Sequence, residues 1–349
     1  MITRDTIRDL DPSGMMETVR SFPHHIKDAV RIGMSASLAI RARGIRSIIV
    51  TGLGGSAISG DLLRCFLADM LPVPFIVNRA YGLPAFVDEN SLVVVSSYSG
   101  DTEETVSAHR EALRRKARVL AVTSGGAVAS LARRAGHPCI VIPGGFHPRA
   151  ALAYSFFPIL AALIRLGLVR PMSGGIGETV TLLSGMSDRL ADPLSSDNQA
   201  LRLASTIRGT VPVIYSSAHL EAVNLRWRGQ IAENAKQLAF GNVLPEMNHN
   251  EIVGWKALPE IERSLSVVFL SDRESHRRVV HRELFTQELL RERASSISVV
   301  QSIGRSRLAR TFSLVHLGDW VSLYLAAMNG EDPSPVSVID ALKEKLRTV

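Results

Sequence analysis

The chain has 349 residues, a length that predicts two domains of ordinary size. Hydrophobic residues make up 46% of it, enough for large cores, and the 5% of aromatic residues argues against a nucleic-acid reader that stacks bases on aromatic rings. The formal net charge of +7 comes from dispersed Lys and Arg, so we expect a solvated basic surface or a small anionic ligand, and no nucleic acid partner.

The sequence shows little sign of a signal peptide, a disulfide framework or a membrane span. Residues 1–10 are charged and lack the apolar run of a signal peptide, and Cys65 and Cys139 lie far apart in apolar segments, as buried thiols do in a reducing compartment. The apolar stretch 150–168 is about as long as a membrane span, but it contains Pro158 and continues a strand–helix alternation. We therefore predict a cytoplasmic protein without membrane association, in which this stretch is a buried helix.

The first 168 residues are predicted to contain a helical segment and an α/β domain. Residues 1–34 are expected to be helical with a break at Pro23, and residues 35–168 to form the domain. Its strands are short apolar runs at 46–51, 74–77, 92–96, 118–123 and 139–142. Apolar strands that alternate with helices are typical of a parallel sheet covered on both faces.

The same order of elements restarts in the second half of the chain. Residues 169–194 are predicted to hold a glycine-rich linker at 171–177 and a helix, and residues 195–349 to form a second domain. Its predicted elements are strands at 211–216, 266–271 and 297–303 and a long helix from 219 to about 239. We therefore predict two copies of one doubly wound α/β domain, each a flavodoxin-like three-layer arrangement of helices around a parallel sheet.

Two loops of the first domain have the composition of a phosphate site. Residues 52–56, Gly-Leu-Gly-Gly-Ser, follow the first strand, and glycines there let an anion approach the start of the next helix, although a plain tight turn is the alternative. In residues 97–103, after the third strand, the hydroxyls of Ser97, Ser99 and Thr102 can converge with backbone N–H groups on one phosphate. The alternative for this loop is a helix cap made by Ser99 or the aspartate that follows it.

Together the motifs resemble a known family. A strand, then Ser-x-Ser-Gly-x-Thr-x-Glu, then a helix resembles the sugar isomerase (SIS) domain. The whole chain is similar to the bifunctional phosphoglucose/phosphomannose isomerase family, which has two such domains. The similarity covers nearly the whole chain through the motifs Gly52–Ser56, Ser97–Glu104, Pro148–Ala151, Glu233–Lys236, Pro245–Glu251 and Ile339–Lys343.

The resemblance implies a role for each residue that matches a family motif. Glu233 would be the base that transfers a proton, and Arg149 would be the cation near C1 and C2 of the sugar. His249 and Lys343 would help to open the sugar ring. The phosphate would be bound by residues of the two loops, namely Gly55, Ser56, Ser97, Ser99 and Thr102.

Two positions depart from the family pattern, because Asp101 and Ala232 stand where relatives commonly have Asn. Neither departure removes a catalytic group, but Asp101 adds a negative charge near the expected phosphate. The second domain also lacks the Gly- and Ser-rich loops of the first. We therefore expect it to donate residues to the site without binding the phosphate.

These residue types suit an aldose–ketose isomerisation. One carboxylate can move a proton between C1 and C2 through an enediolate, a guanidinium can stabilise the developing oxyanion, and a His can transfer the proton that opens the ring. Each residue has an ordinary alternative as well. Glu233 could pair with Lys236 on a helix surface, His249 could be a turn residue, Arg149 could pair with a carboxylate, and Lys343 could be solvated.

The resemblance implies glucose 6-phosphate and fructose 6-phosphate as substrates, with mannose 6-phosphate accepted as well. It also implies a homodimer in which the ring-opening His is contributed across the subunit interface and the apolar helix 151–167 forms part of the buried contact. Two alternatives stay open. One is a non-catalytic sugar-phosphate-binding protein, and the other is an isomerase of a different phosphosugar.

No cofactor and no metal are predicted. Glu246, His249 and Glu251 invite a metal site, as do the adjacent His24 and His25. The first group contains no Cys and no second His, which is too few ligands for zinc.

Overall fold

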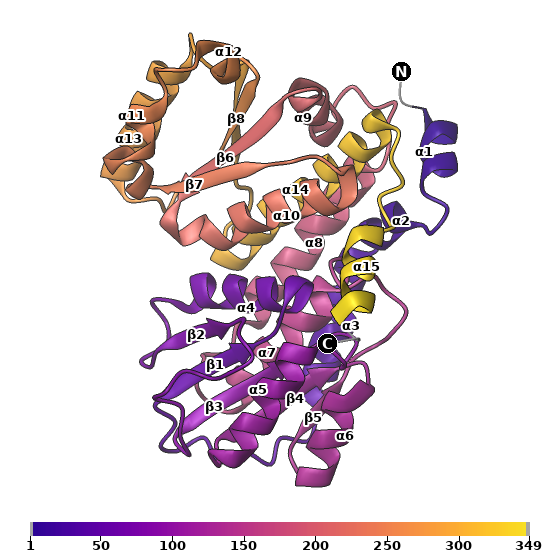
Figure 1. The fold of residues 1–349 in the computed structure, drawn as a ribbon, viewed down its shortest axis with the longest axis vertical. Helices are drawn as coiled ribbons and strands as arrows, with labels where there is room; N and C mark the ends of the chain where they lie inside the picture. The colour runs from indigo at the N-terminus through magenta and orange to yellow at the C-terminus, as the bar shows by residue number, and fades with distance from the viewer. Residues whose placement is uncertain (1–2, 347–349) are drawn as a thin grey trace. The chain divides into compact units, whose positions relative to one another are not determined.

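A computed structural model describes residues 3–346 of the protein, and the chain forms two compact units (Figure 1). The first unit contains residues 21–182 and 304–309. The second unit contains the other described residues, 3–20, 183–303 and 310–346. The domain boundaries expected from the sequence remain a prediction.

A five-stranded parallel sheet is the centre of the first unit. Its strands are β1 Ser47–Thr51, β2 Phe75–Asn78, β3 Ser91–Ser96, β4 Arg118–Thr123 and β5 Cys139–Val141, in the order β2-β1-β3-β4-β5. Every residue of β1 and β3 is buried, as in strands that are covered on both faces. Thr51 pairs with Val95, so the loops after β1 and β3 leave the sheet at the same edge. The predicted parallel sheet is confirmed.

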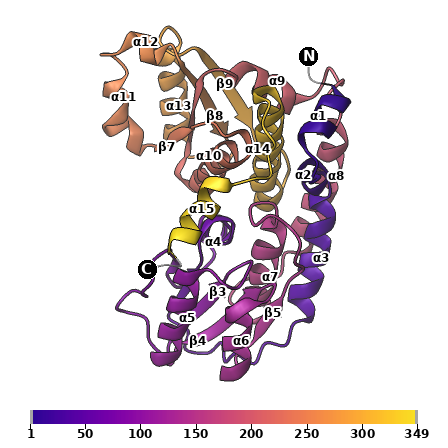
Figure 2. The same ribbon diagram turned by 45° about the vertical axis from the view of Figure 1, so that its right-hand side comes forward.

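Helices cover both faces of this sheet (Figure 2). The helices α5 Glu103–Arg114 and α6 Gly126–Ala135 pack on the face that includes Ile49. The opposite face carries α4 Gly54–Leu67, whose Gly60 backbone approaches Val50. Next to α4 lies α7 Leu152–Arg165, which in turn packs against α3 Phe22–Ser35. The first unit therefore has the three-layer arrangement that was predicted. Its two cysteines, Cys65 and Cys139, are not joined in a disulfide and are only half-buried.

The apolar stretch of the sequence forms α7 and is buried within the first unit. Residues 152–163 are all buried, and α7 lies so close to α3 that a Cβ at Gly33 would be 2.7 Å from Ala161 Cβ. The buried helix is confirmed, but the prediction that it forms a subunit contact is wrong for these residues, because α3 and α4 already cover them. Among residues 3–346, no helix combines the length and the apolar character needed to cross a bilayer.

The N-terminal region is helical as predicted, with α1 Arg4–Leu10 and α2 Met15–Arg20 before α3. The break falls at Ser21, and Pro23 stands in the first turn of α3, where a missing N–H removes no helical hydrogen bond. The glycine-rich linker predicted at 171–177 is wrong from Ser173 onward, because α8 Ser173–Leu190 begins there. Burial of apolar residues of α8 such as Leu183 outweighs the low helix propensity of its glycines.

A four-stranded parallel sheet is the centre of the second unit. Its strands are β6 Val211–Ser217, β7 Phe240–Leu244, β8 Leu265–Ser271 and β9 Ser296–Gln301, in the order β7-β6-β8-β9. This order has the same form as β2-β1-β3-β4, so the repeated domain is confirmed. The strand β7 was not predicted. The helix expected from 219 to about 239 is instead the 3₁₀ turn η1 Ala218–Leu220 followed by α10 Glu221–Ala235.

Seven further elements follow β6 or lie just before it in the chain. They are α9 Gln199–Ile207, the 3₁₀ turn η2 Glu246–His249, α11 Glu251–Gly254, α12 Pro259–Glu262, α13 Arg277–Leu290, α14 Arg307–Asn329 and α15 Ser337–Leu346. The core beside β6 and β8 contains Tyr215, Met247 and Trp255. The segment that follows β7 therefore contributes directly to the core.

Candidate active site

The two loops predicted to bind phosphate lie at one point of the first sheet. The strands β1 and β3 are neighbours, but the chain passes from β1 to β2 and returns at β3, and open α/β sheets bind ligands where the strand order reverses in this way. Each loop leads into a helix, α4 at Gly54 and α5 at Glu103. The first N–H groups of a helix have no partner within it, so this edge of the sheet suits an anion.

Hydrogen bonds join the two loops. Ser56 Oγ accepts a hydrogen bond from the Tyr98 N–H at 3.2 Å. Ser97 Oγ accepts one from the Gly100 N–H at 3.1 Å and lies 3.2 Å from Thr102 Oγ1. Ser56 and Ser97 are buried, and Thr102 is half-buried. Ser97 Oγ is the donor in its contact with Thr102, so the structure brings these three predicted hydroxyls into one hydrogen-bonded loop pair.

The charge of Asp101 is directed at a neighbouring helix. Its Oδ1 accepts a hydrogen bond from the Ala127 N–H at 2.8 Å, in the first turn of α6, where a carboxylate is favourable. Exposed Ser99 accepts a hydrogen bond from the Asp101 N–H at 3.3 Å. The alternative in which Ser99 or Asp101 caps α5 is wrong, because Thr102 is the N-cap residue of α5 and Asp101 bonds to α6.

Gly55 lets a third segment approach the loops. A Cβ at position 55 would collide with the carbonyl oxygen of Pro148 and would lie 3.1 Å from the backbone nitrogen of Arg149. The other loop holds the same segment, since Tyr98 Oη accepts a hydrogen bond from the Phe146 N–H at 2.8 Å. Arg149 is buried, with 4% of its surface exposed. The first unit therefore contains Arg149 beside the predicted phosphate loops, while its role remains a prediction.

Glu233 belongs to a helix, α10, that is fixed along one face. Arg226 Nε and Nη2 lie 3.0 and 2.8 Å from the two carboxylate oxygens of Asp319 in α14, and Gln230 Nε2 donates to the same carboxylate at 3.1 Å. One turn further along α10, Asn234 Nδ2 donates to a serine hydroxyl of α14 at 2.9 Å. Arg226 and Asp319 are both buried, and a buried pair is costly to break. These contacts set the rotation of α10.

Glu233 lies in the last turn of α10, next to this anchored face, and is half-buried. Lys236, with a φ of +54°, ends the helix, and its Nζ donates to the carbonyl oxygen of Glu233 at 2.7 Å. A lysine at this position stabilises the end of a helix. The catalytic role of Glu233 and the alternative of a surface pair with Lys236 both remain predictions.

His249 and Lys343 lie on two other elements of the second unit. His249 is the last residue of η2 and is exposed. Lys343 lies on α15, a helix in which no described residue is buried, and its Nζ is 3.7 Å from Asp340 Oδ1. The six predicted residues of the first unit are thus gathered around two loops. The three of the second unit stand on separate elements, and their roles remain predictions.

The residues of the metal alternative have other contacts. Two side chains of the second sheet hold the Glu251 carboxylate, and Glu246 Oε1 accepts a hydrogen bond from Asn250 Nδ2 at 2.7 Å. His25 is buried, with its ring centroid 5.0 Å from that of Phe146, and burial lowers its pKa. Within the described residues 3–346, no three His, Cys, Asp or Glu side chains are arranged to hold a metal ion.

A charged cluster at the corresponding edge of the second sheet was not predicted. Asp272, directly after β8, accepts hydrogen bonds through Oδ2 from Arg310 Nε at 2.8 Å and Ser302 Oγ at 2.6 Å, and His219 Nε2 lies 3.6 Å from Oδ1. Burial acts to raise the pKa of Asp272, but these hydrogen bonds and the Arg310 charge outweigh it and hold the pKa below its ordinary value. Asp272 follows β8 as Ser97 follows β3, and this correspondence was the available signal.

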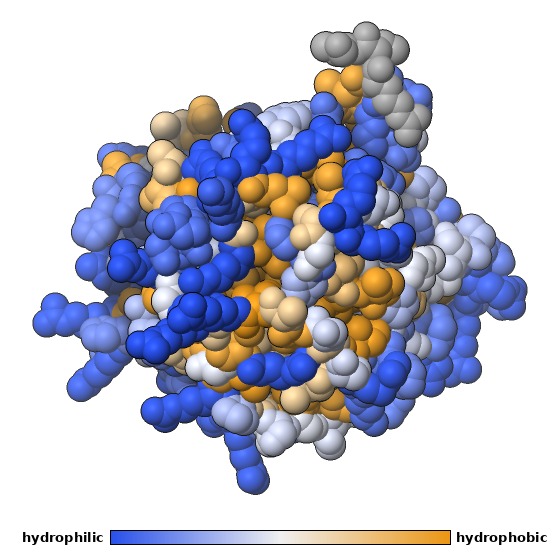
Figure 3. Space-filling view, turned by 90° about the horizontal axis from the view of Figure 1, so that it is seen from below, coloured by the Kyte–Doolittle hydropathy of each residue, from blue (hydrophilic) through white to orange (hydrophobic). Residues whose placement is uncertain are grey.

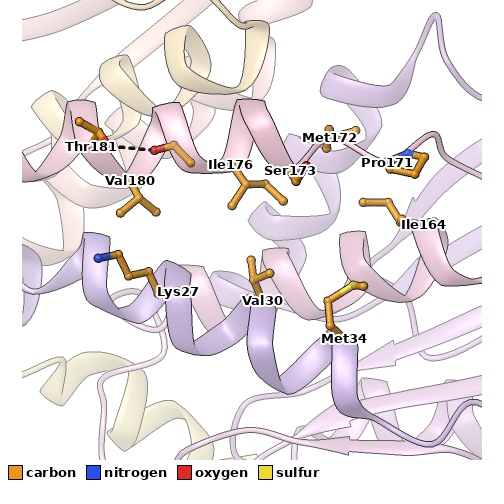
Figure 4. Close-up of a pocket in the computed structure, with 11 residues that line it drawn as sticks. Lys27, Val30, Met34, Ile164, Pro171, Met172, Ser173, Ile176, Val180 and Thr181 are labelled. Carbon is orange, nitrogen blue, oxygen red and sulfur yellow. Dashed lines mark hydrogen bonds between the residues drawn. The ribbon is translucent and has the colours of Figure 1, made fainter.

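An apolar groove of the first unit lies apart from these residues (Figure 4). Its volume is about 560 Å³, and it lies between α3, the end of α7 and the start of α8. Figure 4 shows Val30, Met34, Ile176 and Val180 pointing into it, with Lys27 at its side. None of the predicted site residues lines this groove. It lacks the convergent polar groups that orient a ligand, so it is not the candidate active site.

Comparisons with known proteins cover both halves of the chain. The family described as "SIS domain" matches residues 43–165, and the one described as "Bacterial phospho-glucose isomerase C-terminal SIS domain" matches residues 196–346. A bifunctional phosphoglucose/phosphomannose isomerase of Caldicellulosiruptor bescii is 45% identical over 337 residues, which is 96% of this chain and 99% of that relative. One of Aquifex aeolicus is 36% identical over 304 residues, which is 86% of this chain and 91% of that relative.

A solved structure, described as a glucose-6-phosphate isomerase like protein of Thermus thermophilus, has a TM-score of 0.65 with this chain at 20% sequence identity. The match covers 99% of this chain and 99% of that one. At this identity the likeness supports the fold of the whole chain.

Proposed function

The chain belongs to the bifunctional phosphoglucose/phosphomannose isomerase family, and we propose that it interconverts glucose 6-phosphate and mannose 6-phosphate with fructose 6-phosphate. The observation that carries this proposal is the pair of hydroxyl-bearing loops at the switch point of the first sheet, beside buried Arg149. Each of the three sugars carries a phosphate group at C6, and the sugars differ from one another only at C1 and C2. A single phosphate site can therefore serve both reactions.

The phosphate is bound, in this proposal, by the loops 52–56 and 97–103. The hydroxyls of Ser56, Ser97, Ser99 and Thr102 donate to its oxygens, and the N-termini of α4 and α5 add N–H groups and the positive ends of their dipoles. Gly55 leaves room for close approach. Neutral donors bind the ester without a strong fixed charge, which permits the product to leave.

Glu233 moves the proton between the two carbons. Starting from the aldose, its carboxylate takes the proton from C2, and the electron pair forms the C1–C2 double bond of the enediolate. The hydroxyl proton passes from O2 to O1, the carboxyl group returns a proton to C1, and the carbonyl group is left at C2. The Arg149 guanidinium stabilises the negative enediolate oxygen without giving up a proton. General base catalysis of this kind contributes about 10²–10⁴-fold to a rate.

Ring opening precedes this step, and we assign it to His249 with the help of Lys343. An imidazole ring has two nitrogens that can donate or accept a proton, so it can transfer the proton between the ring oxygen and the hydroxyl at C1. Both side chains are exposed in the single chain, which supports a homodimer in which His249 completes the site of a second copy. Figure 3 shows apolar side chains gathered in the middle of one face within a hydrophilic border, a surface that also favours association.

The reaction links glucose and mannose phosphates with fructose phosphate, so we propose a cytoplasmic enzyme that acts in glycolysis and gluconeogenesis. No cofactor is needed, because the proton and the electron pair stay on the sugar and the Glu233 carboxyl group. The basic surface plays no part in this proposal.

Isotope exchange in deuterated water tests the proposal. The parent enzyme is expected to introduce deuterium at C1 or C2 of its substrate, and Glu233→Gln to lose activity by about 10²-fold or more. Phosphate binding should be retained, measured as stabilisation of the variant by glucose 6-phosphate. Glu221→Gln, an exposed carboxylate in the first turn of the same helix, is the matched control and should remain active.

Each alternative has its own result in this experiment. A non-catalytic sugar-phosphate-binding protein would bind the substrate and leave its carbon-bound protons unexchanged. An isomerase of another phosphosugar would be inactive on these hexoses and active on a pentose phosphate or an amino sugar phosphate. Unchanged turnover in Glu233→Gln would refute the base assignment.

A further inference from the structure

The segment 245–255, which carries His249, is held to the second sheet by the Glu251 carboxylate and by the Trp255 indole. We propose that Glu251 is a positioning residue for ring opening, because it fixes this segment and thereby the place of the His249 imidazole. The inference rests on the proposed function and extends it to a residue that does not touch the sugar.

Both oxygens of the Glu251 carboxylate are held by neighbouring strands. Tyr215 Oη of β6 donates to Glu251 Oε1 at 2.5 Å, and Asn242 Nδ2 of β7 donates to Oε2 at 2.7 Å. Tyr215 and Asn242 are paired across the two strands, so the two donors are fixed relative to one another by the sheet. A carboxylate held at two points by charge-assisted hydrogen bonds has little rotational freedom.

The donor Tyr215 is itself held in place. It is fully buried, and Trp255 Nε1 donates to its hydroxyl oxygen at 3.0 Å. Burial, together with the hydrogen bond to Glu251 and the charge of that carboxylate, raises the pKa of Tyr215 well above its usual range. The phenol therefore stays protonated and donates to Glu251 at every pH at which the enzyme works.

His249 lies between this tether and a second set of anchors. Met247 is fully buried in the core, and Asn248 Nδ2 donates to Thr286 Oγ1 of α13 at 3.0 Å. His249 follows these two residues, stands two residues before Glu251, and is exposed. The chain is thus fixed on both sides of a side chain that is directed to solvent, which is the arrangement expected where a loop presents a group to a ligand.

Substitutions at position 251 test the proposal in the full-length enzyme. Glu251→Ala removes both tethers, whereas Glu251→Gln keeps the length of the side chain and exchanges one acceptor oxygen for a donor. We expect Glu251→Ala to lower kcat for glucose 6-phosphate on the order of 10- to 100-fold, as displacement of a catalytic group by about 1 Å does, and Glu251→Gln to lower it less.

Combination with His249→Asn separates positioning from a merely structural role. If Glu251 acts through His249, then Glu251→Ala should change kcat by less than about twofold once the imidazole is gone, because coupled residues are not additive. Multiplicative losses in the double variant would overturn the inference. So would an unchanged kcat in Glu251→Ala alongside an impaired His249→Asn.

Tyr215→Phe and Tyr324→Phe form a matched pair of controls. Both remove a hydroxyl from a buried tyrosine of the second unit, but Tyr324 Oη donates to the carbonyl oxygen of Leu190 at 2.6 Å and lies outside the His249 segment. We expect both variants to lower Tm and only Tyr215→Phe to lower kcat. Equal kcat losses would overturn the inference. A parent enzyme without isomerase activity would instead remove the proposed function, and the inference with it.

Discussion

The carboxyl edges of the two sheets have the same topology but carry different side chains. Where β1 and β3 of the first sheet end, neutral hydroxyls such as those of Ser56 and Ser97 surround the starts of two helices. Where β8 of the second sheet ends, the Asp272 carboxylate is bound by Arg310 and Ser302. In the second sheet, the protein's own carboxylate therefore occupies donors that could otherwise bind a phosphate.

This difference shows how a repeated fold can keep one anion site and close the other. In the second sheet the anion is part of the chain and is always present, so an added phosphate would meet a like charge. The donors of the first sheet carry no such charge. We infer that the second copy is thereby released from phosphate binding and can present Glu233 and the His249 segment.

The largest expected effect comes from removing the Asp272 carboxylate at the edge of the second sheet. Asp272→Ala leaves the guanidinium of Arg310, 1% exposed, without its carboxylate, although Glu274 still contacts it. Breaking a buried ion pair from one side costs about 3–5 kcal/mol, and we expect a loss of that order in the free energy of unfolding, measured by chemical denaturation. Sulfate or phosphate should raise the Tm of this variant more than that of the parent, because the vacated donors can accept an anion.

The exposed pair of Asp69 and Arg307 in the first unit is the control for this prediction. The two side chains approach to 2.5 Å, but that of Asp69 is 61% exposed, so Asp69→Ala should cost no more than about 1 kcal/mol. Equal losses in the two variants, or a Tm of Asp272→Ala that does not respond to sulfate, would contradict the idea of a site filled by its own carboxylate.

One serine from each edge gives the next largest contrast. In the proposed site, Ser97→Ala removes a donor to the phosphate. Since a hydrogen bond to a charged group contributes about 1.5–3 kcal/mol, we expect KM for glucose 6-phosphate to rise about 10- to 100-fold. Ser302→Ala removes a hydroxyl of the second edge and should lower Tm while leaving KM unchanged. Steady-state kinetics of the two variants gives both KM values. Similar values would contradict the idea that only the edge of the first sheet binds the phosphate.

The sequence predicted the parts of the molecule that depend on local patterns. The strands β1 and β3 are continuous apolar runs, and the hydroxyls of Ser56, Ser97 and Thr102 follow such runs at the start of helices. Burial and capping requirements determine these features within a few residues of chain. They could therefore be identified without knowledge of the rest of the fold.

Features that depend on distant partners were missed. The strand β7 is short and contains Gly241 and Asn242, and only its pairing with β6 makes it a strand. A Cβ at Gly241 would collide with the carbonyl oxygen of Ile214, so the glycine is required by the neighbouring strand. The pairing of Asp272 with Arg310 likewise joins residues that are 38 positions apart. No local pattern indicates such contacts.

The smallest expected effect concerns a buried side chain of the first unit whose polar atoms, unlike those of Asp272, are not satisfied. His109 of α5 is fully buried, and neither ring nitrogen has a hydrogen-bond partner. Burial and the neighbouring His137 lower the pKa of His109 to about 4, whereas an unfolded His has a pKa of about 6.5. As the pH falls from about 6.5 to about 4, only the unfolded state binds this proton, so the free energy of unfolding decreases over that window.

His109→Leu should remove this acid sensitivity. Lowering the pH from about 7.5 to about 5.5 should decrease the free energy of unfolding of both proteins. The decrease should be smaller in the variant, by at most about 1.4 kcal/mol, because one pKa unit corresponds to about 1.4 kcal/mol. Urea unfolding at the two pH values measures the difference. His281→Leu, at an exposed position of α13, is the control and should follow the parent. The stability of His109→Leu could instead fall with pH as steeply as that of the parent. His109 would then bind its proton in the folded state as well, and the contrast with Asp272 would fail.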